Sequence, residues 1–258
     1  MTVSSQSAQR NLSIRLSTDG FSFSVLDPSS DDGPTFTDLP VDETRSLAAN
    51  LRGVLRQNEA LGQPYRRVNV LIASRRWTVM PLELFEDEQA EAVLGYVHTV
   101  PEHEEVSYNV LTSSNAVVVF ALDRAMRDLL LAQWPEAKFF AQSTPLIEHF
   151  ARRSHLGNSR KLYAFIHHEH LGVYAFERGH LLLANSMECR ETADRIYYLM
   201  YIWRQLGLEQ KRDELHLSGL LPEKDELLAG LRRYVNCVCV AGRPEHLDLQ
   251  VAWEVGLR

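Results

Sequence analysis

Residues 12–27, LSIRLSTDGFSFSVLD, alternate between apolar and polar side chains at every second position. A period of two places the apolar side chains on one face of a β-strand and the polar ones on the other, which is typical of half-buried strands. The alternation breaks at Thr18, Asp19 and Gly20, and an Asp-Gly pair favours a tight turn. The stretch therefore predicts a β-hairpin, and the question is whether its turn also binds phosphate.

The same order of predicted elements occurs twice along the chain. After the first hairpin, the pattern predicts a strand near 35–39, a helix within 41–61 and a strand at 66–74. From residue 161, three strands, a helix at 192–208 and a strand at 213–219 follow in the same order. The repeated order β-β-β-α-β indicates an α/β fold of two similarly built subdomains, each a mixed sheet with flanking helices.

A polar stretch separates the two copies. HLGNSR at 155–160 is the best linker candidate and divides the chain into a first subdomain, 1–156, and a second, 157–258. The tail at 245–258 alternates at every second residue, which predicts an extended segment. Whether this tail returns to the first subdomain is left open.

The bulk composition excludes several function classes. The 258 residues have a formal net charge of −7, which argues against general nucleic-acid binding. The first eleven residues lack the apolar region of a secretory signal, and the apolar run at 116–122 is too short to span a bilayer. These features predict a cytoplasmic protein without membrane insertion.

A β-β-β-α-β-α-β unit used twice resembles the plan of actin, sugar kinases and Hsp70. More closely, the whole chain is similar to a small Bacteroidetes family with an actin-like (RNase H-like) ATPase fold and no assigned function, and LSIRLSTDGFSFSVLD shows the closest similarity. The resemblance implies ATP held between two subdomains. The first hairpin of each subdomain would grip phosphate, and a Gly-Gly turn would hold adenosine.

The first phosphate motif of that group reads Asp-x-Gly-Thr. The best overlay puts Arg15 at the Asp, Ser17 at the Gly and Thr18 at the Thr. The resemblance gives the Asp a role in organising Mg²⁺, and a guanidinium cannot replace an oxygen ligand of a hard cation. Asp19 is one residue beyond Thr18, and Gly20 fits a simple tight turn. We therefore expect Thr18, Asp19 and Gly20 to form only a hairpin turn.

The other two nucleotide motifs are also incomplete. The second hairpin, FIHHEHLGVYAF, has no Asp and no glycine pair, although a phosphate loop needs glycines so that backbone N–H groups can approach. The adenosine motif keeps Ser218 and Gly219, but Leu220 replaces its second glycine. The remnant nucleotide site would thus consist of Thr18, Asp19, Gly20, Ser218 and Gly219. We expect no cofactor and no hydrolysis, with weak binding of ATP and Mg²⁺ as the alternative.

Two clusters could hold a metal. HHEH at 167–170 places two histidines on one strand face, and His180 follows, but the spacing matches no zinc motif. We predict no tight metal at His167, His168, His170 or His180. Cys237 and Cys239 share a face of a predicted buried strand, so a metal pair is conceivable, yet buried thiols acting as small apolar residues are the favoured interpretation.

The segment 197–206, YYLMYIWRQL, is apolar on nearly all sides of a helix. Such a helix is buried on several sides, or part of it meets a partner. Tyr201 and Trp203 are the candidate partner-binding residues, rimmed by Arg195 and Arg204. The sequence thus favours a non-enzymatic scaffold or adaptor that binds an unidentified protein. A residual ATP-binding protein of the kinase or ATPase type is the alternative, and self-association is left open.

Overall fold

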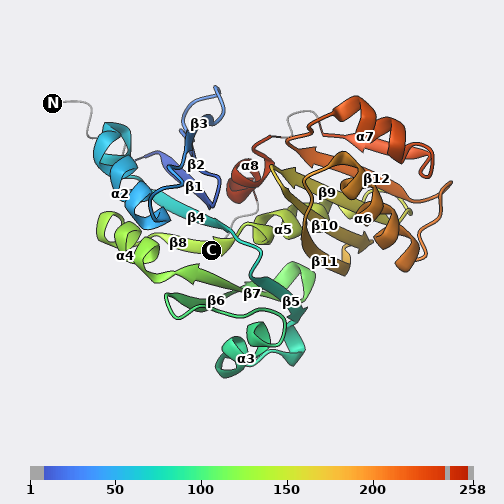
Figure 1. Ribbon diagram of the computed structural model, residues 1–258, viewed down its shortest axis with the longest axis horizontal. Coiled ribbons are helices and arrows are strands. Elements are labelled where there is room, and N and C mark those ends of the chain that lie inside the picture. The colour runs from blue at the N-terminus through green and yellow to red at the C-terminus, as the bar shows by residue number, and fades with distance from the viewer. Residues whose placement is uncertain (1–8, 242–244, 255–258) are drawn as a thin grey trace. The chain divides into compact units, whose positions relative to one another are not determined.

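The computed structural model describes residues 9–241 and 245–254. The described part of the chain forms two compact units (Figure 1). Unit 1 contains the described residues of Met1–Val110, Val117–Pro145 and Asp248–Arg258, and unit 2 contains those of Leu111–Ala116 and Leu146–Leu247. The main division falls before Leu146, one helix ahead of the stretch 155–160 that the sequence offers as a linker.

Unit 1 is built on a five-stranded mixed sheet in the order β3-β2-β1-β4-β8. The first three strands pair antiparallel, whereas β4 and β8 add in parallel. A second sheet has the order β5-β7-β6. The strands are β1 (Asn11–Ser17), β2 (Gly20–Leu26), β3 (Thr35–Pro40), β4 (Arg67–Ala73), β5 (Trp77–Pro81), β6 (Glu104–Leu111), β7 (Ala116–Asp123) and β8 (Lys138–Ala141).

Helices cover both sheets of unit 1. Figure 1 shows α2 (Leu47–Gln57) beside α4 (Arg124–Gln133) on one face of the larger sheet. On the other face, α8 (Leu247–Glu254) packs Leu249 against Leu71. The short α3 (Ala90–Gly95) packs Leu94 against β7.

The polar face of β1 is fully buried, although its alternation predicts a half-buried strand. Arg15 is paired in register with Leu71, so both side chains are on the face that α8 covers. Ser13 is 0% exposed, Arg15 3% and Ser17 3%. Burial of polar side chains costs free energy unless hydrogen bonds compensate, so this face needs partners from elsewhere in the chain.

Unit 2 repeats the architecture with the strand order β11-β10-β9-β12-β13. Again the first three strands pair antiparallel, and the last two add in parallel. The predicted repeat of β-β-β-α-β is therefore confirmed. The elements are α5 (Ser143–Ser154), β9 (Lys161–His167), β10 (His170–Glu177), β11 (His180–Glu188), α6 (Thr192–Gln205), β12 (Glu214–Gly219), α7 (Lys224–Leu231) and β13 (Cys237–Val240).

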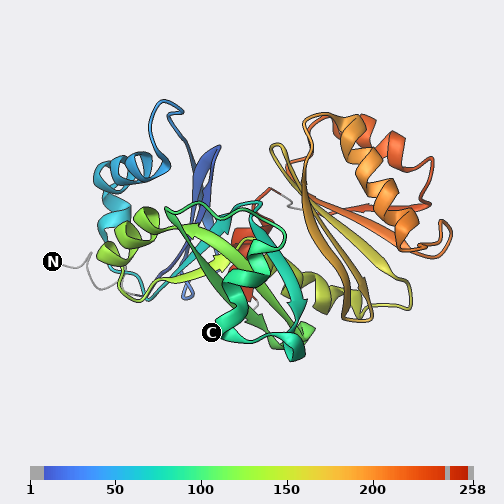
Figure 2. The same ribbon diagram turned by 60° about the horizontal axis from the view of Figure 1, so that its bottom comes forward.

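The two faces of the second sheet carry different packing. Figure 2 shows α6 and α7 together on one face, where Leu162, Leu199 and Leu227 belong to one buried apolar cluster. On the other face, Phe150 of α5 stacks on Tyr163 of β9 with ring centroids 4.4 Å apart. The alternation of β9 places Leu162 and Tyr163 on opposite faces, so both faces are buried.

The predicted extended tail is wrong for the described residues. Residues 247–254 form the helix α8 rather than an extended segment, and residues 255–258 are outside the described part. Leu249, Val251 and Ala252 are buried, at 0%, 0% and 1% exposure. Packing of this apolar segment on the sheet of unit 1 outweighs the local alternation that favoured a strand.

Candidate functional site

The turn at Thr18 and Asp19 joins β1 to β2, and Leu16 pairs with Phe21 across it. This confirms the predicted hairpin. Among the described residues with positive φ, neither of these two nor Gly20 is found, so the turn does not use the backbone freedom of glycine. A Cβ at Gly20 would lie 3.1 Å from the carbonyl oxygen of Leu39 on β3, which explains a small residue there.

Arg15, at the position that the resemblance assigns to the Mg²⁺-organising Asp, is committed to an ion pair. Its Nη1 donates to both carboxylate oxygens of Asp248, at 3.0 and 3.1 Å, and its Nη2 donates to Ser22 Oγ at 2.7 Å. Gln142 Nε2 donates to the same carboxylate at 2.7 Å. The side chains of Arg15 and Asp248 are 3% and 0% exposed. The end of β1 therefore presents a buried guanidinium that fastens α8 to the sheet.

Asp248 is a residue that the sequence analysis missed. It is 233 positions from Arg15, in a segment read as extended. The available signal was a single Asp within the mostly apolar run LDLQVAW. A carboxylate inside an apolar helix is rarely buried without a cationic partner.

The second hairpin turns at His168 and Glu169, between β9 and β10. His168 has φ +50°, where a phosphate loop would use glycine. The buried Arg195 of α6 donates through Nη2 to the carbonyl oxygens of His168, at 3.3 Å, and Cys189, at 3.1 Å. The hairpin is thus braced by a cation at its backbone carbonyls. The absence of a tightly bound metal at its histidines stays a prediction.

Ser218 and Gly219 end β12 in unit 2, whereas the first hairpin belongs to unit 1. Ser218 Oγ donates to Ala164 O at 3.0 Å. Gly219 has φ +89°, and a Cβ there would lie 1.9 Å from the carbonyl oxygen of Ile166. Close approach of β12 to β9 therefore accounts for this glycine without a ligand, and its role in binding nucleotide stays a prediction.

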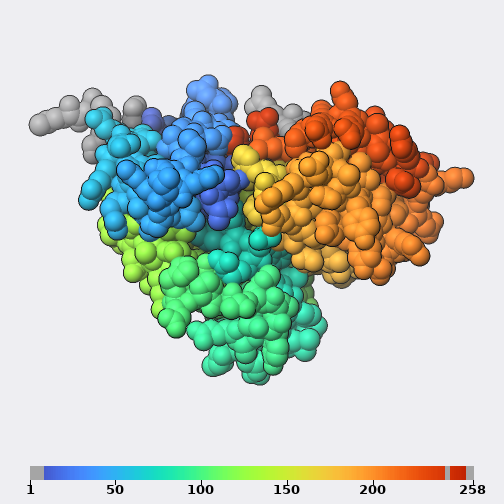
Figure 3. Space-filling view, in the orientation of Figure 1, coloured from blue at the N-terminus to red at the C-terminus, as the bar shows by residue number. Residues whose placement is uncertain are grey.

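The two candidate partner-binding residues on helix α6, Tyr201 and Trp203, differ in their exposure to solvent. Trp203 is 6% exposed and belongs to the apolar core of unit 2, so intramolecular packing explains it. Tyr201 is 51% exposed and Tyr197 is 63% exposed. Their rings stack with centroids 6.2 Å apart and an interplanar angle of 21°. In Figure 3 the segments around β11 and α6 are the orange part of the surface of unit 2.

The rim of this aromatic pair differs from the one expected. Arg195 is 4% exposed and points inward to the second hairpin, so it does not flank the tyrosines. Arg204 and Asp194 are exposed on α6 instead. The outer face of α6 is therefore two stacked tyrosines between an acidic and a basic side chain. We call Asp194, Tyr197, Tyr201 and Arg204 the α6 face.

The interpretation of Cys237 and Cys239 as buried thiols is wrong. Cys237 is exposed and Cys239 is partly exposed, whereas the third cysteine, Cys189, is 1% exposed. The strand β13 is at one end of the strand order of its sheet, so within residues 9–241 and 245–254 its outer side has no strand neighbour. An apolar sequence pattern does not distinguish such an edge strand from a central one.

The two sheets of like topology define an actin-like fold, and solved structures agree. A Bacteroides thetaiotaomicron protein, described as having an actin-like ATPase fold and unknown function, is 46% identical, with a TM-score of 0.92 over 98% of this chain and 99% of its own. The chain belongs to the family described as "Protein of unknown function (DUF3822)", whose match covers residues 2–238. None of the curated proteins matches the chain significantly.

More distant structures share the fold only. The PilM-PilN type IV pilus biogenesis complex contains a chain 12% identical, with a TM-score of 0.60 over 95% of this chain and 98% of that one. The ethanolamine utilization protein EutJ from Carboxydothermus hydrogenoformans is 11% identical, with a TM-score of 0.50 over 94% and 88%. As for membranes, the helices within the described residues are all too short or too polar to cross a bilayer.

Proposed function

We propose that this chain is a non-enzymatic protein-interaction module, a scaffold or adaptor, whose actin-like fold has lost its ATP site. The observation that carries the proposal is the buried ion pair of Arg15 with Asp248. The cation stands where the resemblance needs a carboxylate, and the pair holds it inside unit 1. A hard Mg²⁺ ion takes oxygen ligands, so this position contributes repulsion instead of coordination.

The second hairpin supports the same conclusion. A phosphate loop presents backbone N–H groups, which requires small residues at the turn. Here the turn residues are His168 and Glu169, and Nη2 of Arg195 donates to the carbonyl oxygens of His168 and Cys189. The carboxylate of Glu169 pairs with Arg190 at 3.2 Å. Two large side chains at this turn keep a nucleotide polyphosphate from the close backbone approach that glycines allow.

The proposal predicts that the protein does not hydrolyse ATP. With Mg-ATP, phosphate release is expected to equal that of a protein-free control. The reason is that the first phosphate motif lacks its oxygen ligand and the second lacks its glycines. Phosphate release and calorimetric ATP titration measure this, with Asp19→Asn as the test variant and Asp31→Asn as its matched control. Turnover that Asp19→Asn removes and Asp31→Asn keeps would contradict the proposal. Saturable binding without turnover would favour the residual ATP-binding alternative.

The α6 face is the proposed contact surface. Exposed aromatic side chains are enriched at the centres of protein interfaces, and charged groups at their rims. Stacking already orders the rings of Tyr197 and Tyr201, which reduces the entropy that a partner would have to remove. The similar fold in the PilM-PilN complex, which is named as a complex of two assembly components, supports a binding role for an actin-like fold.

We expect Tyr197→Ala with Tyr201→Ala to remove partner binding and leave the protein folded. Both rings are more than half exposed, so the free energy of unfolding is expected to change by about 1 kcal/mol or less, or roughly 2–4 °C in Tm. Cross-linking in the native host measures the contact, by comparing the proteins cross-linked to the double variant with those cross-linked to the wild type. Tyr234→Ala, at 54% exposure in the same unit, is the matched control. If a partner is still cross-linked to the double variant but not to Tyr234→Ala, the contact lies elsewhere.

A further inference from the structure

One surface segment of unit 1 combines exposed apolar side chains with exposed carboxylates. The segment 86–97 contains α3 and, directly before it, the short 3₁₀ helix Asp87–Gln89. Figure 1 shows α3 at the lower end of unit 1, next to β5, β6 and β7. Ala90 and Leu94 of α3 pack inward, in one apolar cluster with Val117 of β7. The opposite side of this helix is the one that another molecule can reach.

The exposed residues of this segment share one side of the helix. Glu88, Glu91, Ala92 and Gly95 recur at intervals of three and four residues, which places them on one face. All four are exposed, and Tyr96 follows at the carboxyl end. We call Glu88, Glu91, Ala92, Gly95 and Tyr96 the α3 face. It has carboxylates at its amino end, small side chains in the middle and an aromatic ring at its carboxyl end.

The carboxyl end of α3 exposes apolar side chains that the core does not use. Tyr96 is 88% exposed, and the next residue, Val97, is 56% exposed. Tyr96 N donates to Ala92 O and Val97 N donates to Leu94 O, each at 3.1 Å, so the helix holds both residues in place. Tyrosine is enriched at protein interfaces, where its ring supplies apolar contact area at a low cost in conformational entropy.

The charge around the α3 face is of one sign. Residues 77–110 contain eight Asp or Glu and no Lys or Arg. Two of these acids are neutralised by cations from outside this stretch, since Glu104 pairs with Arg76 and Glu105 with Arg127. The five acids within or closest to α3 in sequence are exposed, and none forms an ion pair with a residue that the structure describes: Glu83, Glu86, Asp87, Glu88 and Glu91.

The ionisation of Tyr108 on β6 reflects the sign of this field. A hydrogen bond to Asp87 raises the pKa of the Tyr108 hydroxyl, and desolvation and the charges of Asp87 and Glu88 raise it further. The neighbouring carboxylates therefore oppose a negative charge at this point. The same field favours a positive charge brought in by another molecule.

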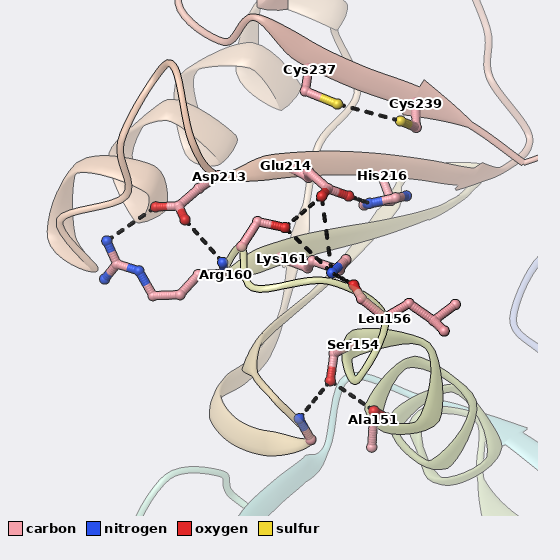
Figure 4. A network of polar contacts seen from close by, with 12 residues as sticks. Ala151, Ser154, Leu156, Arg160, Lys161, Asp213, Glu214, His216, Cys237 and Cys239 are labelled. Atoms are coloured by element: carbon pink, nitrogen blue, oxygen red, sulfur yellow. Dashed lines mark hydrogen bonds and ion pairs between the residues drawn. The ribbon is translucent and has the colours of Figure 1, made fainter.

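Carboxylates at the start of β12 in unit 2 show the opposite case, because their partners are inside the chain. Figure 4 shows Asp213 paired with Arg160, with 3.1 Å between the charged groups. Glu214 is 2.8 Å from His216 and 4.0 Å from Lys161. A cation from another molecule would have to displace these partners. At the α3 face it would meet carboxylates that have no cationic partner among the described residues.

We propose that the α3 face binds an amphipathic basic helix of a partner protein. Lys or Arg side chains of that helix pair with Glu88 and Glu91, and an apolar side chain packs on Tyr96. The small side chains of Ala92 and Gly95 let the backbone of a second helix approach closely. The α3 face belongs to unit 1, whereas the α6 face belongs to unit 2, so the proposal depends neither on that surface nor on the loss of the ATP site.

Binding of a model helix to the full-length protein tests the proposal. The probe is a fluorescent peptide of about 14 residues, or four turns, with Leu and Lys at amphipathic helical spacing, and its control has Glu in place of each Lys. We expect one Lys peptide per chain at micromolar concentration, because a face of about two turns buries little area. Its affinity should fall about 10-fold between about 0.05 and 0.3 M salt, and the Glu peptide should not bind.

Variants on the α3 face should weaken this binding without unfolding the protein. Glu88→Gln with Glu91→Gln should weaken it about 3- to 20-fold, and Tyr96→Ala about 10-fold. Asp31→Asn with Asp32→Asn is the matched control, because it removes two exposed charges elsewhere in unit 1. This control and the double variant of the α6 face should bind as wild type does. Circular dichroism checks the fold of each variant.

Hydrogen exchange locates the bound peptide on the wild-type protein, where it should slow exchange of the amides of residues 86–97. The proposal is overturned if the Lys peptide shows no saturable binding or if the α3-face variants keep wild-type affinity. Equal losses in the Asp31 and Asp32 control would mean that net charge alone attracts the peptide, which also overturns it. Self-association of the wild type that Tyr96→Ala removes would make a second copy the occupant and overturn the partner helix.

Discussion

Asp248→Ala is expected to destabilise the protein by about 3–5 kcal/mol, because it leaves the buried guanidinium of Arg15 with only the exposed carboxylate of Asp38, 3.8 Å away, as a counter-charge. The ion pair is almost completely removed from water, with side-chain exposures of 3% and 0%. Ser22 Oγ would be the remaining hydrogen-bond acceptor for the terminal nitrogens. For a chain of this length, the loss corresponds to a decrease of about 6–20 °C in Tm, measured by calorimetry.

The matched variant replaces both partners. Arg15→Met with Asp248→Leu removes both charges and keeps the volume, so the double variant should be close to wild type or more stable. Arg15→Met alone should also be costly, since it removes the guanidinium that donates to both oxygens of this fully buried carboxylate. A Tm for Asp248→Ala within about 1 °C of wild type would show that the pair does not fasten α8. Additive single effects would show that the two side chains are not coupled.

Gly219→Ala is expected to prevent folding of unit 2 or to cost more than about 4 kcal/mol. The new Cβ would be 1.9 Å from the oxygen, 2.7 Å from the nitrogen and 2.8 Å from the carbonyl carbon of Ile166, which are all backbone atoms. Leu220 N donates to the same carbonyl oxygen at 2.7 Å, so separation of the strands also breaks that hydrogen bond. Denaturant unfolding monitored by circular dichroism measures the effect.

Gly207→Ala is the control for backbone strain alone. Gly207 has φ +59°, and a Cβ there would have no heavy atom within 4 Å. Its cost is therefore limited to the left-handed conformation, about 1–2 kcal/mol. Equal stability of the two alanine variants would mean that β12 can move away from β9. That result would also reopen the interpretation of Gly219 as a glycine kept for a ligand.

Much of the fold is readable in the sequence because its elements are strongly periodic. The alternation of residues 12–27 predicts the first hairpin, since one-residue slips would move every apolar side chain to the wrong face. The repeat of three strands, a helix and a strand predicts the second sheet. For the nucleotide motifs, Arg15 and the turn residues His168 and Glu169 are visible as departures from the expected pattern. These departures can be recognised from the sequence because they concern the residue type at a single position.

The partners of those residues depend on long-range packing. The counter-charge of Arg15 is 233 positions away, and no local pattern connects the two. Likewise, the sequence of β13 does not show that this strand is at the edge of its sheet, so the exposure of Cys237 follows only from the strand order.

Helix α8 shows the limit of local pattern most directly. The sequence by itself determined that the segment is apolar enough to be buried, but its alternation indicated a strand. An isolated helix of eight residues is only marginally stable in water, so tertiary contacts decide its conformation. Leu249 and Ala252 pack against Leu71 and Phe140, and Asp248 pairs with Arg15. Periodicity determined the strands and the α6 helix, whereas burial of one specific charge pair and one apolar face decided the conformation of the tail.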